Sequence, residues 1–129
     1  MTGNSITIAI RHTADSSGAN SLATQAEVEA AGGVAYSTAE QYTQQLVAYF
    51  NKIFELYGRQ VKLVDFNGTG NYTNEELDQD QAAACADADS VASSVHAFGV
   101  IDFEGNFEPG PFAECAPRYK LYVCAGIVQ

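Results

Sequence analysis

The chain has few basic residues and no long apolar run. It carries 6 lysines and arginines against 16 acidic side chains, a net charge of −10, which disfavours binding to nucleic acids and to anionic membrane surfaces. No apolar stretch approaches the roughly 18 residues of a membrane span, and the start "MTGNSITIAIRH" lacks the pattern of a signal peptide. We therefore expect neutral or cationic partners, no nucleic acid and no membrane insertion. A cytosolic protein, a mature secreted region and a gene fragment all stay open.

Several chemistry-bearing motifs are also missing. No GxGxxG or Walker A sequence follows the first apolar segment, so nucleotide phosphate binding has no support. The three cysteines, Cys85, Cys115 and Cys124, show no CxxC spacing, which gives a zinc site or a thioredoxin-type site little support. We expect neither a cofactor nor a metal.

The residues that are present indicate a folded globular chain. Apolar side chains make up 47% of the 129 residues and aromatic ones 11%. This length suits one domain with a single modest core, so we take residues 1–129 as one domain.

Four segments have the patterns of β-strands. Ile6, Ile8 and Ile10 alternate with small or polar residues, and a similar alternation covers residues 59–66. Residues 97–103 and 121–128 are short continuous apolar runs, typical of strands that are buried on both faces of a parallel sheet.

Helical patterns separate these strands. Apolar residues recur at spacings of three and four over residues 37–57, after a capping box of Ser37 and Glu40, and Gly58 ends the pattern. A second capping box, Thr73 with Glu76, opens an Ala-rich helix over residues 73–95. Short helices are predicted over residues 111–116 and, within a polar excursion, 23–31.

The alternation of strands and helices predicts an α/β fold. We expect a Rossmann-like three-layer sandwich with a mostly parallel sheet of about four strands in the order 2-1-3-4. In such sheets ligands bind beyond the carboxyl ends of the strands. Function is therefore to be sought just after residues 11, 66, 103 and 125.

The stretch "DFNGTGNYTNEE", residues 65–76, matches the ligand spacing of an EF-hand calcium loop. An EF-hand also needs a helix that enters the loop, whereas "GRQVKLV" before it alternates like a strand. We therefore favour a turn that joins a strand to a capped helix.

Arg11, His12 and Thr13 follow the first strand, and this "RHT" resembles the Arg-His-Gly signature of histidine phosphatases. Such enzymes need further basic residues and a second histidine. The other histidine, His96, precedes a strand and lies at the wrong end of the sheet. A small flavodoxin-like or histidine-phosphatase-like hydrolase that uses His12 and Asp102 stays as the alternative function, and a solvated strand end is the favoured interpretation.

Three segments together resemble the N-terminal lobe of type I periplasmic-binding-type receptors, the substrate-binding proteins of branched-chain amino acid ABC importers. They are "ITIAIR", "YTQQLVAYFNKIFELYGRQVKLVDF" and "DQAAACADADSVASSVHAFGVIDFEG", and "FAECAPRYKLYVCAG" fits the family's fourth strand and the helix before it. The resemblance covers the first four strands of the first lobe, and implies a partial lobe of that fold.

The resemblance implies a disulfide between Cys85 and Cys115, and two buried thiols are the alternative if the protein stays in the cytosol. Cys124, in an apolar strand, is expected in the core. It also implies ligand contacts from the loops after the first, third and fourth strands: Thr13, Ala14, Asp15, Ser16, Asp102, Glu104, Gly105, Asn106, Ala125 and Gly126. The acidic "DFEGN" departs from the hydroxyl and amide residues of amino-acid-binding members, which favours a cationic or amide-like ligand.

The resemblance implies a binding protein without chemistry of its own. The expectation is a fragment of an extracytoplasmic solute-binding component of an ABC uptake system, lipid-anchored in its full-length form, that works with a transporter permease. It would bind a small polar ligand such as an amino acid or an amide in a two-lobe cleft. A third possibility is an interaction domain with an exposed sheet edge at its C-terminal strand.

Overall fold

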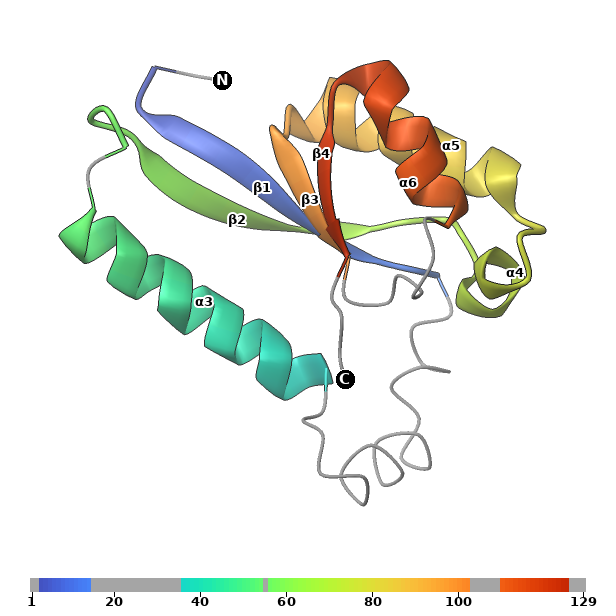
Figure 1. The fold of residues 1–129 in the computed structure, drawn as a ribbon, viewed down its shortest axis with the longest axis horizontal. Coiled ribbons are helices and arrows are strands. Elements are labelled where there is room, and N and C mark those ends of the chain that lie inside the picture. The colour runs from blue at the N-terminus through green and yellow to red at the C-terminus, as the bar shows by residue number, and fades with distance from the viewer. Residues whose placement is uncertain (1–2, 15–35, 55, 103–109, 126–129) are drawn as a thin grey trace.

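The computed structural model describes residues 3–14, 36–54, 56–102 and 110–125. Its centre is a sheet of four parallel strands, β1 (Ser5–His12), β2 (Gln60–Asn67), β3 (Gly99–Asp102) and β4 (Tyr122–Ala125), in the order β2-β1-β3-β4 (Figure 1). The predicted fold class and strand order are confirmed.

Helices flank the sheet on both sides, which gives three layers (Figure 1). On one face lies α3 (Tyr36–Ile53). On the other, α5 (Gln81–Ser90) continues into a π-helical turn, η1 (Val91–Val95), beside α6 (Pro111–Cys115) and its 3-10 extension η2 (Ala116–Tyr119). The short α4 (Tyr72–Glu76) follows β2.

The Ala-rich segment predicted as one helix over residues 73–95 forms two. Asn71, not Thr73, caps α4, because its side chain accepts a hydrogen bond from the Asn74 backbone N–H at 2.9 Å. Asp78 has a left-handed φ of 59°, which ends α4 before α5 begins. The strands predicted over 97–103 and 121–128 begin later than predicted, at Gly99 and Tyr122, and residues 103 and 126–128 lie outside the described residues. The short helix predicted over 23–31 also lies outside them.

The buried core lies between the sheet and the helices α5 and α6. The sheet contributes Ala9 and Val100, and the helices and the turn before β4 contribute small and medium side chains: Ala84, Ala88, Val91, Phe112, Cys115, Ala116 and Leu121. Because alanines face the strands, α5 packs close to the sheet. This close packing brings the polar residues of α5 near the carboxyl ends of the strands.

A disulfide joins Cys85 of α5 to Cys115 of α6, with a Cα–Cα distance of 5.2 Å and 30 residues between them in sequence. The implied pairing is therefore present. Cys115 is fully buried. A largely buried disulfide is typical of proteins that fold in an oxidising, extracytoplasmic environment.

The expectation that Cys124 lies in the core is wrong. Successive side chains of a strand point to opposite faces, and in β4 it is Val123 that packs against the core. Tyr122, which is 68% exposed, and the free thiol of Cys124 therefore lie on the other face. Among the described helices, that face carries α3 alone.

Helix α3 is anchored at the outer edge of the sheet. The Asn51 side chain donates to the Val61 carbonyl and accepts from the Val61 N–H, both at 2.8 Å. These bonds satisfy backbone groups of β2 that point away from β1, and so protect an edge strand. No described helix is long and apolar enough to cross a membrane.

Candidate functional site

The chain order reverses between β1 and β3. From β1 the chain passes through α3 to β2 on one side, and from β2 it returns through α5 to β3 on the other side of β1. Arg11 lies in register with Phe66 of β2 and with Asp102 of β3. The carboxyl ends of these strands flank a topological switch point, where open α/β sheets bind ligands.

A buried arginine lies directly beneath this edge. Arg11 is 1% exposed, and its guanidinium donates to three carboxylates from three different elements. The distances are 2.5 and 3.0 Å to Glu75 of α4, 2.9 Å to Asp87 of α5 and 3.2 Å to Asp102 of β3. The guanidinium carbon also lies 4.4 Å from the centre of the Phe112 ring. Arg11 thus connects both helical segments after β2 to the two central strands.

The charges of this cluster shift the pKa of two of its members. Burial alone would lower the pKa of Arg11, but the hydrogen bond to Glu75 and the negative charges of Asp102 and Glu75 raise it. Burial raises the pKa of Glu75, the contacts with Arg11 oppose this, and the charges of Asp102 and Asp87 add to it. Arg11 is therefore permanently charged, and Glu75 is easier to protonate than an ordinary glutamate.

Asp87 holds the loop between β2 and α4. It accepts hydrogen bonds from the Thr69 N–H at 2.8 Å, the Thr69 hydroxyl at 2.9 Å and the Gly70 N–H at 3.2 Å, besides that from Arg11. A Cβ atom at Gly70 would collide with the Glu75 carboxylate and the Arg11 guanidinium. A larger residue at this position would displace the Glu75 carboxylate and the Arg11 guanidinium from their contact.

Two backbone hydrogen bonds join this loop to the segment after β1. The Gly68 N–H donates to the His12 carbonyl, and the Ala14 N–H donates to the Gly70 carbonyl, each at 2.8 Å. Thr13, between them, is 4% exposed. Of the predicted ligand residues, Thr13 and Ala14 therefore lie against the β2–α4 loop.

The other predicted ligand residues divide into two groups. Asp102 is buried and hydrogen-bonded to Arg11, so it does not offer an open carboxylate to a cationic ligand. Ala125 ends β4, in register with Asp102. The remaining residues lie outside the described part of the chain: Asp15, Ser16, Glu104, Gly105, Asn106 and Gly126.

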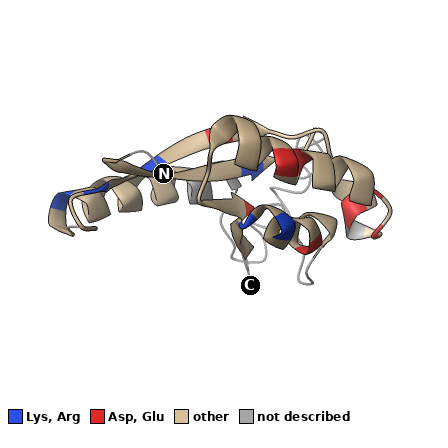
Figure 2. Ribbon diagram, turned by 90° about the horizontal axis from the view of Figure 1, so that it is seen from above, with Lys and Arg blue, Asp and Glu red and all other residues tan. Residues whose placement is uncertain are grey.

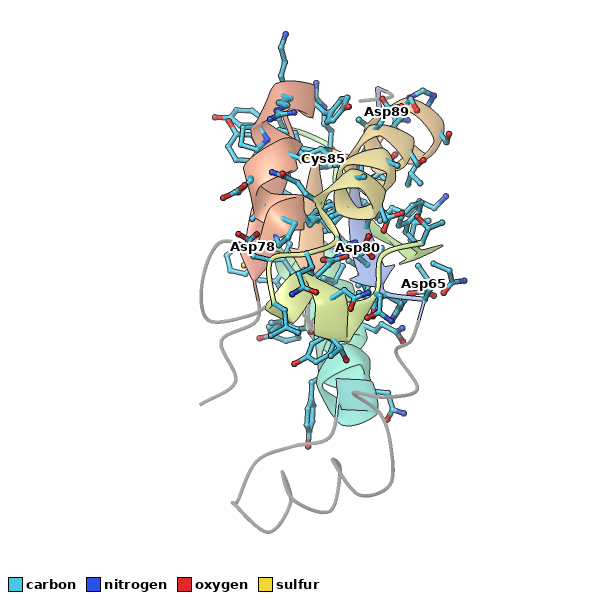
Figure 3. All side chains as sticks on the ribbon, turned by 90° about the vertical axis from the view of Figure 1, so that its right-hand side faces the viewer. Asp65, Asp78, Asp80, Cys85 and Asp89 are labelled. Atoms are coloured by element: carbon cyan, nitrogen blue, oxygen red, sulfur yellow. A yellow bond between two sulfur atoms is a disulfide. The ribbon has the colours of Figure 1, made fainter. Side chains whose placement is uncertain are left out.

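Residues 65–76 form the strand-to-helix turn that we favoured over a calcium loop. The Asp65 side chain is 61% exposed, and Figure 3 shows it well apart from Asp78. Glu75 contacts Arg11, and Asp80 accepts from the Asn71 N–H at 3.0 Å. Among the described residues, no group of three or more Asp, Glu, His or Cys side chains is placed to hold a metal ion.

His12 is partly exposed at the end of β1. Its Nε2 atom lies 3.9 Å from an Asp65 carboxylate oxygen. The neighbouring Arg11 is surrounded by three carboxylates, so a phosphate that approached it would meet negative charge. His96 follows η1, before the amino end of β3. The arrangement gives a histidine-phosphatase mechanism no additional support.

Sequence reasoning missed Glu75 and Asp87. Their signal was indirect. Arg11 lies two residues after the small core residue Ala9, on the same face of β1, and a buried arginine requires carboxylate partners. The Ala-rich face of α5 has room for one acid, but the sequence alone does not say which of the nearby acids turns inward.

Comparison with known proteins finds no matching family model, no similar curated protein and no similar solved structure.

Proposed function

We propose that this chain binds a small polar solute at the carboxyl edge of its sheet, as the extracytoplasmic solute-binding component of an ABC-type uptake system. The observation that carries the proposal is the strand order β2-β1-β3-β4. It places the carboxyl ends of β1 and β3 side by side at the switch point, where open α/β sheets bind their ligands.

The Arg11 cluster supports a binding role because it makes the edge rigid. Four elements are fixed by hydrogen bonds from one buried guanidinium. Loops that are positioned before the ligand arrives lose less conformational entropy on binding. Asp102 already pairs with Arg11, so its carboxylate is not available to hold a ligand. We therefore expect hydrogen bonds to hold the ligand, which favours an amino acid or a carboxamide.

The disulfide supports the proposed location. Cys85 and Cys115 are joined, as expected for a protein that acts outside the reducing cytosol. Transport itself, and a permease as partner, rest on the resemblance of the segments around β1, α3, β2 and β3 to solute receptors.

One sheet edge encloses a ligand on one side only, so we expect weak binding. A dissociation constant on the order of 1 mM corresponds to about −4 kcal/mol. At about 20 mM ligand, such binding would stabilise the folded chain by about 2 kcal/mol and raise its melting temperature by several degrees.

A thermal-unfolding screen tests the proposal. Free amino acids and small carboxamides are each added at about 20 mM, a concentration that follows from the expected affinity. We expect at least one compound to raise the melting temperature of the wild type, and Asn106→Ala to reduce that shift by half or more. Asn4→Ala removes the same side chain at the amino end of β1 and should keep the full shift.

If no compound raises the melting temperature, or if Asn4→Ala and Asn106→Ala lose the shift equally, the solute-binding proposal is wrong. Phosphatase activity that is lost in His12→Ala would instead support the hydrolase alternative.

A further inference from the structure

One side of α3 carries an exposed apolar stripe. Tyr42, Leu46, Tyr49 and Ile53 are spaced by four, three and four residues, and they are 61, 66, 60 and 54% exposed. This spacing puts the four side chains on one line along the helix, the pattern by which two helices pack together. Water-exposed helices rarely keep such a stripe unless another surface covers it.

The stripe does not line the groove between α3 and β2. On the other side of α3, Gln44, Ala48 and Asn51 line a groove of about 280 Å³ with Leu63 and Asp65 of β2. At 3.6 residues per turn, the stripe lies opposite that groove. It therefore lies on the side of α3 away from that groove.

At β4 the sheet surface on this side is also exposed, whereas Ile10 of β1 is buried. Tyr122 is 68% exposed and Cys124 is exposed, both on the α3 side of β4. Helices pack 8–10 Å apart and strands about 4.8 Å apart, so four strands need about two helices on each face. The core face has two, α5 and α6, whereas the described part of this face has one (Figure 1).

We propose that a second copy of this chain covers this surface, with the α3 helices of the two copies side by side. A two-fold axis that runs along the helices between the copies puts each α3 beneath β3 and β4 of the other copy. The contact is then self-complementary and closed. The proposal is independent of the solute site, which lies at the ends of the strands.

The charge distribution favours this partner. Helix α3 contains one acid, Glu40, and one base, Lys52. Residues 72–90, around α4 and α5, contain six acids and no lysine or arginine, and Figure 2 shows this acidic region at the far end of the molecule from α3. Two copies that meet through α3 thus keep their acidic regions apart, although each chain carries a net charge of −10.

The available area is sufficient for a dimer. Four large side chains that are about 60% exposed offer on the order of 500 Å² per copy, or about 1,000 Å² in total. This is near the lower limit of specific interfaces, so we expect a dissociation constant on the order of 1–10 μM.

Sedimentation equilibrium of the full chain tests the proposal, together with the rate at which the Cys124 thiol reacts with a maleimide. Cys124 is the one cysteine outside the disulfide. We expect a dimer whose formation slows the reaction at Cys124. Leu46→Glu should weaken dimerisation by at least about 30-fold and restore rapid reaction.

Leu77→Glu is the matched control, because Leu77 is 61% exposed and lies at the end of α4, away from the stripe. Leu77→Glu should leave the dimer dissociation constant and the reaction rate of Cys124 unchanged. Both variants should retain the wild-type circular dichroism spectrum. A monomer at 200 μM would overturn the proposal, whether Cys124 reacts rapidly or is shielded by the chain's own residues. Equal weakening by Leu46→Glu and Leu77→Glu would also overturn it.

Discussion

Arg11 organises the carboxyl edge of the sheet at the scale of single residues. Its guanidinium forms ion pairs with carboxylates from three elements that are far apart in sequence. A buried ion pair stabilises little relative to apolar packing, but the removal of one partner leaves the others charged and unpaired. The cluster therefore fixes which loops meet at the edge, and loss of its single cation would leave three carboxylates unpaired.

The variant Arg11→Met should lose about 3–5 kcal/mol of unfolding free energy, because Asp87, Asp102 and Glu75 would remain buried without a cation. Urea unfolding followed by circular dichroism measures this loss. Arg118→Met changes an exposed arginine in η2 and should cost less than about 0.5 kcal/mol. Equal losses in the two variants would contradict the role given to Arg11.

Glu75 should make stability depend on pH. Its pKa in the folded chain lies above the ordinary 4.5, because burial penalises its charged form. The folded chain therefore binds a proton at Glu75 in a range just above pH 4.5 where the unfolded chain has released it. Stability from this group is complete below the unfolded pKa and is lost as the pH rises through the folded one.

Urea unfolding of the wild type and of Glu75→Gln from pH 7 to pH 4.5 measures this effect. As the pH falls, the wild type should gain unfolding free energy relative to the variant. Parallel curves, or a wild type that loses free energy relative to the variant, would show that Glu75 does not take up the proton.

Residue-level chemistry was the part of the site hardest to predict. The positions after β1 and β3 follow from the strand pattern, and Thr13, Ala14 and Asp102 do lie at that edge. The strand pattern does not show whether these residues are exposed or paired. The burial of Asp102, for example, depends on Arg11, 91 residues earlier in the chain. Contacts over such separations leave no periodic signal in one sequence.

At the scale of elements, the strands and helices were mostly predictable. The period-two and helical spacings of β1, β2 and α3 reflect real faces, and the strand order is confirmed. The break between α4 and α5 was missed because the glutamates before Asp78 and the alanines after it all favour helix. The position of Cys124 was misjudged because an apolar run does not reveal that a strand is covered on one face only.

The disulfide between α5 and α6 should contribute about 3–4 kcal/mol to the free energy of unfolding, because it closes a loop of 30 residues. Cys85→Ser with Cys115→Ser removes it, and urea unfolding without reductant measures the loss. Cys124→Ser is the control and should change stability by less than about 0.5 kcal/mol. If the double variant is as stable as the control, the disulfide does not stabilise the helix pair.

At the scale of the whole molecule, three surfaces have separate roles. One face of the sheet is closed by α5, α6 and their disulfide. The other face carries α3 and, on β4, the exposed side chains of Tyr122 and Cys124, and there we propose contact with a second copy. The carboxyl edge, above the Arg11 cluster, is where we propose that a solute binds.

The most direct test of solute binding is an NMR titration of the ¹⁵N-labelled chain with the compound that stabilises it best. The account predicts that the amide shifts that change most belong to residues 12–16 and 102–106, after β1 and β3. Changes centred on the amino ends of the strands, at Ser5, Gln60 and Gly99, or on the α3 face, would contradict it.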